Sequence, residues 1–78
     1  MSPLVQIRQG FQARWNDLTL LVESEDRQWT LRVQEAGSHR VLYTAGRSNR
    51  AAAQSAGLEF AAFRAGAPAR DLQWQPYW

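Results

Sequence analysis

Two polar segments of this sequence bring together side chains of the types that catalyse reactions. One segment holds the carboxylates between Glu23 and Asp26, and the other places Ser38 beside His39, the single histidine. Paired carboxylates divide acid and base roles only when their environments differ. A serine and a histidine that are adjacent in sequence also need an acid to orient the ring. We therefore expect no enzyme activity, and a reaction through His39 and Glu35 is the least favoured alternative.

The composition limits the chain to one small domain without covalent cross-links. Its 78 residues are too few for two domains, and the absence of cysteine excludes a disulfide or a thiolate metal site. We expect no metal and no cofactor. The nine arginines, with no lysine, are typical of GC-rich bacterial genomes, and the net charge is only +2. No apolar run approaches the roughly 20 residues of a membrane helix, and the start lacks a secretory signal, so a cytoplasmic protein without membrane contact is predicted.

Three short runs rich in β-branched and aromatic residues predict an antiparallel meander. The runs are residues 18–23, 29–34 and 41–45, and the polar connections between them have lengths that join antiparallel neighbours. Alternation along each run assigns one face of the sheet to the core. The residues expected on that face are Leu18, Leu20, Val22, Trp29, Leu31, Val33, Val41, Tyr43 and Ala45.

A helix is predicted over residues 49–65, which are rich in alanine and free of proline and β-branched residues. Ser48 is the expected N-cap, and Gly66 followed by Pro68 marks the end of the helix. Gly57 inside the helix indicates a close approach to the sheet. The stripe expected to face the sheet has small residues early and phenylalanines late, namely Ala52, Ala53, Ala56, Phe60 and Phe63.

The two ends of the chain fit more than one structure. Residues 1–16 fit either an amphipathic helix or a strand, and we favour the strand because apolar Val5 and Ile7 alternate with polar residues. The last eight residues alternate as in a short edge strand that Pro76 terminates. The predicted fold class is α+β, with a three- to four-stranded antiparallel meander and one helix of the C-terminal half packed across one face. The single domain spans residues 1–78 around a core of residues 18–65, and whether the segment 67–78 folds back is left open.

An acid-free stretch from Ala36 to Leu58 carries arginines on both sides of the predicted helix start. Guanidinium groups suit phosphates and carboxylates because they donate paired hydrogen bonds. The helix start also lacks an acidic first turn, which leaves backbone N–H groups available to an anion. The hypothesis is a nucleic-acid or anion-binding site, and the alternative is a helix that is capped without any ligand. The residues of this site are Arg32, Arg40, Arg47, Ser48, Asn49 and Arg50.

Leu21 and Leu42 are large apolar residues expected on the sheet face opposite the core. Either a terminal segment of the same chain covers them, or a two-fold dimer buries them. Near the C-terminus, Trp74, Tyr77 and Trp78 belong to residue types that are enriched in binding hot spots. We therefore interpret the chain as a small non-catalytic interaction module that binds another protein or itself through these five residues. Nucleic-acid or anion binding is the alternative function.

The topology of three antiparallel strands followed by one helix, over residues 18–64, resembles two families of small DNA-binding domains. These are the plant ethylene-response factors and the arm-binding domains of tyrosine recombinases, whose exposed sheet face, rich in arginine and tryptophan, enters the major groove. On the corresponding face of this chain, Arg32 is of the residue type found in those families. Glu23, Leu21 and Leu42 are not. The resemblance is one of topology alone.

Overall fold

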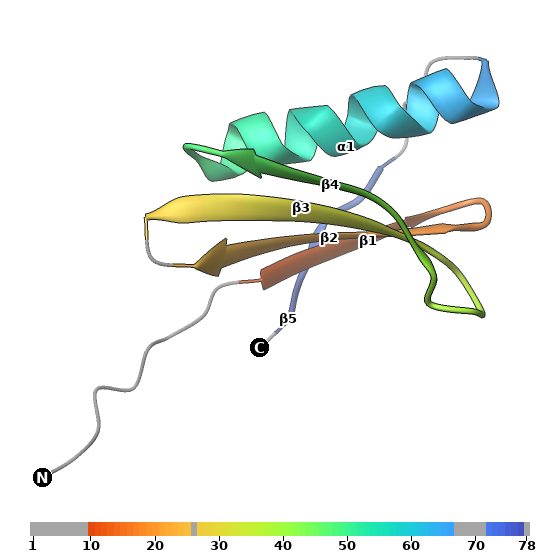
Figure 1. Ribbon diagram of the computed structural model, residues 1–78, viewed down its shortest axis with the longest axis horizontal. Helices are drawn as coiled ribbons and strands as arrows, with labels where there is room; N and C mark the ends of the chain where they lie inside the picture. Colours follow the sequence, from red (N-terminus) through yellow and green to blue (C-terminus); the bar gives the residue numbers. More distant parts are fainter. Residues whose placement is uncertain (1–9, 26, 67–71, 78) are drawn as a thin grey trace, which may run out of the picture.

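The computed structural model describes residues 10–25, 27–66 and 72–77, which form an antiparallel sheet with one helix across one of its faces (Figure 1). The order of the strands across the sheet is β4-β3-β2-β1-β5. The predicted α+β meander is confirmed, and two further strands, one from each end of the chain, widen it to five. The elements are β1 (Gly10–Trp15), β2 (Leu18–Glu25), β3 (Gln28–Glu35), β4 (Val41–Arg47), α1 (Arg50–Ala65) and β5 (Gln75–Tyr77).

The first described strand, β1, shows that the helix alternative is wrong for residues 10–15. Its alternate residues follow the face pattern of β2, and Ala13 is buried. Asn16 and Asp17 close a two-residue hairpin to β2, and Asn16 takes a φ of 54°. Asparagine tolerates this left-handed conformation better than most residues, so the pair specifies the turn. The expected strand around Val5 and Ile7 lies outside the described residues.

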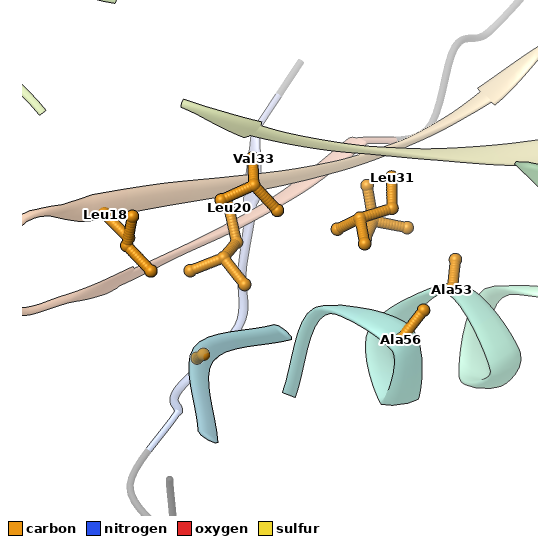
Figure 2. Packing of buried hydrophobic residues seen from close by; sticks show 8 residues of the cluster. Leu18, Leu20, Leu31, Val33, Ala53 and Ala56 are labelled. Carbon is orange, nitrogen blue, oxygen red and sulfur yellow. The ribbon is translucent and has the colours of Figure 1, made fainter. Parts of the chain in front are cut away.

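The core lies between α1 and the two central strands, β2 and β3. Side chains from these strands point toward the helix, and the alternation predicted for them is confirmed (Figure 2). Their burial removes branched apolar surface from water, which is the main favourable term in the folding of a small domain. The large side chains with no exposed surface are Leu18, Leu20, Val22, Leu31 and Val33.

A register shift between β3 and β4 changes which residues of β4 reach the core. Val33 pairs with Tyr43, but Gln34 pairs with Val41, so β4 has one extra residue at this point. A bulge of this kind interrupts strict alternation. Leu42 accordingly packs against the core cluster, whereas 47% of Val41 is exposed. The prediction that placed Val41 in the core and Leu42 on the opposite face is wrong for both residues.

The face of α1 that meets the sheet consists of small residues. Its buried positions are Ala53, Ala56, Gly57 and Ala61. Residues four apart lie on one line along a helix, so three of these positions form a continuous contact line. By contrast, Phe60 is half-buried and Phe63 is 89% exposed. The expected place of Phe63 in the core is therefore wrong.

Gly57 allows the helix to lie close to the central strands, as the sequence predicts. A Cβ atom at this position would lie 2.9 Å from Leu20 Cδ2 and 3.1 Å from Leu31 Cδ1. Carbon atoms in proteins are separated by about 3.5–4.0 Å at their optimal contact. The backbone of α1 at Gly57 therefore lies so close to Leu20 and Leu31 that a side chain at this position would not fit.

The helix α1 ends at Gly66, as predicted. Gly66 takes a left-handed φ of 69°, and its N–H donates to the carbonyl oxygen of Phe63 at 3.3 Å. In the last turn, the Arg64 guanidinium lies 3.1 Å from the Asp17 carboxylate in the β1–β2 hairpin. This exposed pair links the helix end to the hairpin, and such pairs contribute little to stability individually.

In the described ranges, no helix combines the length and the hydropathy needed to cross a membrane.

The C-terminal strand, β5, confirms the predicted short edge strand and shows that residues 75–77 fold back on the domain, a question that the sequence left open. It pairs antiparallel with the first half of β1, from Gly10 to Gln12. Pro76 lies within this strand, so the expectation that it ends the strand is wrong. An edge strand tolerates proline because the sheet needs no N–H group on its outer side.

Replacing Gly57 with alanine tests the close approach of α1. The intrinsic helix propensity of alanine favours the variant by about 1 kcal/mol, but overpacking a core costs about 1–3 kcal/mol. We expect a net loss of about 1 kcal/mol in the free energy of unfolding, measured by urea denaturation. Gly46→Ala is the matched control, because a Cβ atom there meets nothing within 4 Å. A Gly57→Ala chain more stable than the original would contradict the packing described above.

Candidate functional site

The groups considered for catalysis form no catalytic arrangement within the described residues. The Ser38 hydroxyl donates to Glu35 Oε1 at 2.7 Å, so its hydrogen bond is not with the neighbouring imidazole. His39 is exposed in the β3–β4 loop with a φ of 59°. The Glu23 carboxylate accepts from Arg32 at 3.3 Å. Across residues 10–25, 27–66 and 72–77, no three metal-binding side chains cluster together.

The start of α1 is capped by Asn49, and the prediction of Ser48 as the N-cap is wrong. Asn49 has an extended backbone, and its Oδ1 accepts from the N–H of Ala52 at 2.8 Å. This bond satisfies one of the N–H groups that were expected to be available to an anion. The first turn contains no acidic residue, as the sequence indicates.

The arginines assigned to an anion site are not gathered in one place. Arg47 donates to the carbonyl oxygen of the residue before it at 2.7 Å, and the Arg50 guanidinium lies 4.8 Å from the ring centroid of Phe11. Arg40 precedes β4, roughly 23 Å of extended chain from Arg47. Arg32 lies on the sheet face opposite α1, where it pairs with a carboxylate. The six residues of the hypothesis therefore do not line a single pocket.

The two leucines assigned to an interface are also separated. Leu21 is half-buried on the open face, which is the sheet face opposite α1, and it pairs across the sheet with Gln12 and Arg32. Leu42 packs on the core side of the bulge. They do not form one apolar patch, and the open face around Leu21 is polar.

Two C-terminal aromatic residues of the predicted interface hold the sheet edge from both faces. Trp74 packs against the core cluster, and its Cη2 would lie 3.5 Å from a Cβ atom at Gly57. The Tyr77 ring covers Gly10, where an added Cβ atom would lie 2.9 Å from Tyr77 Cζ. Since strand side chains alternate, residues three apart lie on opposite faces. Trp78 lies outside the described residues.

The hydroxyl of Tyr77 is buried on the open face near a charged pair. Neither Tyr77 Oη nor Arg32 Nε makes a hydrogen bond of standard geometry within the described part of the chain. Burial raises the pKa of Tyr77 to about 12. The nearby Glu23 carboxylate adds to this rise, whereas the positive charge of Arg32 opposes it. The cluster therefore favours a neutral phenol.

A partly exposed group of aromatic residues lies on the helix side of the sheet, near β4. We name Tyr43, Phe60 and Phe63 the aromatic flank. The Tyr43 and Phe60 rings stack with their centroids 5.1 Å apart and an interplanar angle of 15°. Phe63 lies one helical turn beyond Phe60 and is 89% exposed. Sequence reasoning assigned all three to the core, although the four-residue spacing of small residues on α1 could have indicated the true contact line.

The strand beside the aromatic flank, β4, is the edge strand on this side of the described sheet. Among the described elements, only β3 pairs with it. In an edge strand, alternate residues direct their N–H and C=O groups away from the sheet. Arg40 and Arg47 lie at its two ends, and neither forms an ion pair with any described residue. We name the outer edge of β4 together with the aromatic flank the β4 surface.

An open groove lies at the other edge of the sheet, where β5 diverges from β1. It has a volume of about 450 Å³. The second half of β1, from Ala13 onward, has no partner in β5. The residues that line the groove are Gln12, Ala13, Arg14, Gln73 and Gln75.

Comparison with known proteins gives no assignment for this chain. No family model, no curated protein and no solved structure matches it. A function must therefore be argued from the geometry and charge of its own residues.

Two alanine variants test which residue caps α1. Asn49→Ala is expected to lower the free energy of unfolding by about 1 kcal/mol, since it removes the bond to the Ala52 N–H. Ser48→Ala is the matched control and is expected to change stability by less than about half of that amount. Urea denaturation of both variants measures the difference. A larger loss from Ser48→Ala would assign the cap to Ser48.

The raised pKa of Tyr77 predicts a loss of stability in alkaline solution. Below pH 10 the phenol is neutral in both states, and between pH 10 and about 12 the unfolded chain ionises first. The unfolded state then binds fewer protons, so the free energy of unfolding falls as the pH rises through this window. The Tyr77→Phe variant should lack the decrease in the free energy of unfolding that Tyr77 causes in this pH window. The Tyr43→Phe variant, whose substitution lies on the opposite sheet face, should retain it. Equal slopes in both variants would contradict the assignment.

Proposed function

We propose that this chain is a non-catalytic interaction module that binds an extended segment of another protein along β4. The observation that carries the proposal is an edge strand of seven residues that no other described strand pairs with on its outer side, beside exposed aromatic rings. In strand addition, main-chain hydrogen bonds supply affinity and alternate side chains supply specificity. The β4 surface offers both kinds of contact.

The charges at the ends of β4 favour an acidic partner. Arg40 and Arg47 flank the strand without ion pairs in the described part of the chain. Glu35 is the acid nearest to Arg40 in sequence, and its carboxylate accepts from the hydroxyl of Ser38. Carboxylates at the two ends of a bound segment would pair with these guanidinium groups and fix its register.

The two faces of β4 indicate the side-chain pattern of the bound segment. On the helix side, its residues would lie beside Tyr43 and Phe63, which favours apolar side chains there. On the open side, they would lie beside Thr44, which is exposed and polar. The partner that we propose is therefore an extended segment with alternating apolar residues and an acid at each end.

Pairing between two copies of this chain through β4 is less favourable. In an antiparallel pairing centred on Thr44, Arg47 of one copy would lie beside Val41 and close to Arg40 of the second copy. Like charges placed across from each other destabilise a strand pair. The use of the same arginines to bind nucleic acid is the alternative function, and it requires no main-chain pairing.

A designed peptide tests the proposal. The probe has seven residues, with glutamate at both ends and valine or phenylalanine at alternate positions between them. On addition of the peptide to the ¹⁵N-labelled chain, amide resonances of Val41–Arg47 should shift and their hydrogen exchange should slow. Phe63→Glu and Arg47→Glu should each weaken binding about tenfold or more, because each places a negative charge against an acidic ligand.

Leu58→Glu is the matched control for Phe63→Glu. It introduces the same charge at another exposed apolar position, about 140° around the helix from Phe63. We expect unchanged peptide affinity in this variant. Equal loss in both variants, or no shift in β4, would overturn the proposal. Salt-sensitive shifts of the amides of Arg47–Arg50 with duplex DNA, and none with the peptide, would support the alternative function instead.

A further inference from the structure

The sheet edge opposite β4 is held by contacts of a different kind. There the C-terminal segment, residues 72–77, pairs with only three residues of β1. The remainder of the β1 edge borders the open groove. The segment is therefore attached to the domain by one short pairing and by its aromatic side chains.

Two glycines of the domain receive these aromatic side chains. Any side chain at Gly10 would overlap the Tyr77 ring, because a Cβ atom there lies within 3.0 Å of Tyr77 Cζ and Cε1. Trp74 packs beside Gly57 in the core, where an added Cβ atom would be at ordinary contact distance, 3.5 Å, from Trp74 Cη2. We name these two positions the glycine sockets. Both belong to residues 10–66, whereas both occupants belong to the C-terminal segment.

The segment thus has the properties of a bound peptide ligand that happens to be covalently attached. Its Trp74 lies on the helix side of the sheet and its Tyr77 on the open face, so the two rings hold β1 between them. Its backbone extends the sheet as an added strand does in peptide recognition. The chemistry that the site selects is an extended strand with a tryptophan and, three residues later, a tyrosine.

We propose that the β1 edge with its two glycine sockets is a second strand-binding site, which accepts the C-terminal segment of either its own chain or a second copy. Exchange of the segment between two copies produces a strand-exchanged dimer. Every socket contact is the same in both arrangements, because each copy carries both the sockets and the segment. The site lies at the edge opposite β4 and does not depend on the function proposed for that strand.

The balance between the two arrangements depends on concentration. A segment tethered by a short linker has an effective concentration in the millimolar range at its own site. In dilute solution, the C-terminal segment therefore binds mainly to its own chain. At millimolar protein concentration, binding to a second copy becomes significant. Where seating within the same chain is blocked, exchange is the only way to fill the sockets.

A complementation experiment between two full-length variants tests this proposal. The first variant, Gly10→Val, keeps its aromatic residues but has a blocked socket. The second, Trp74→Ala with Tyr77→Ala, has open sockets but no aromatic residues to fill them. Neither variant can seat a segment alone, whereas a mixed pair can place the segment of the first in the sockets of the second.

The readout is the indole N–H resonance of Trp74 in the ¹⁵N-labelled first variant. We expect this resonance to move away from its original position in the isolated variant and to return when the unlabelled second variant is added at millimolar concentration. Light scattering should then show a mass about twice 8.9 kDa for the mixture. The control is Gly46→Val as the labelled chain, which retains its seated segment and should not respond to the second variant.

The outcomes are distinguishable from those of the β4 experiment. No return of the Trp74 resonance and no dimer in the mixture would overturn the proposal. Resolved amide resonances of the core strands confirm that each variant is folded. If Gly10→Val does not fold, Gly10→Ala serves as the blocked chain, and the same two readouts apply. Binding of the designed peptide to β4 should be the same in the Gly10 variants and in the Trp74→Ala, Tyr77→Ala variant, none of which alters a residue of β4.

Discussion

The close approach of α1 to β2 and β3 at Gly57 is the constraint on which the rest of the structure depends. The helix touches the sheet through backbone and methyl groups, so no large side chain fits beneath it. Aromatic residues are consequently displaced to its two sides. Phe60 and Phe63 lie on the β4 side, while Trp74 fills the space beside Gly57. The small residues on the buried face of α1 thereby leave space for aromatic side chains only beside this contact.

The two edges of the sheet differ in length, composition and contacts, and the difference supports the function proposed for β4. Natural sheets protect their edges with short strands, proline or charge. The edge at β5 is only three residues long, contains Pro76 and is held by aromatic contacts. The edge at β4 is seven residues long and carries charge only near its ends. Within the described residues, one edge is thus protected in several ways and the other is not, and this contrast is what favours the proposed binding at β4.

The sequence was sufficient where local rules determine the structure. Alternation identified the strands β2 and β3, and Gly66 identified the end of α1, because each depends on backbone geometry at that position. The places of Val41 and Phe63 could not be predicted in this way, because a bulge and the rotation of the helix depend on packing between distant elements. β1 was predictable in principle, since Asn16 and Asp17 are residues typical of a tight turn. Trp74 and Tyr77 were predicted to lie in an interface with another molecule, and the contacts that the structure shows for them are within the same chain.

The arginines illustrate how geometry resolves a charge pattern that composition leaves ambiguous. An acid-free stretch in the sequence first indicated a site at the start of α1. There, however, Asn49 caps the helix and Arg50 lies over an aromatic ring, so both already have partners. Arg32 and Arg64 pair with acids that are distant in sequence. The same stretch also contains the whole of β4, so its positive charge lies along the outer side of this strand and acts on any charged group that approaches it.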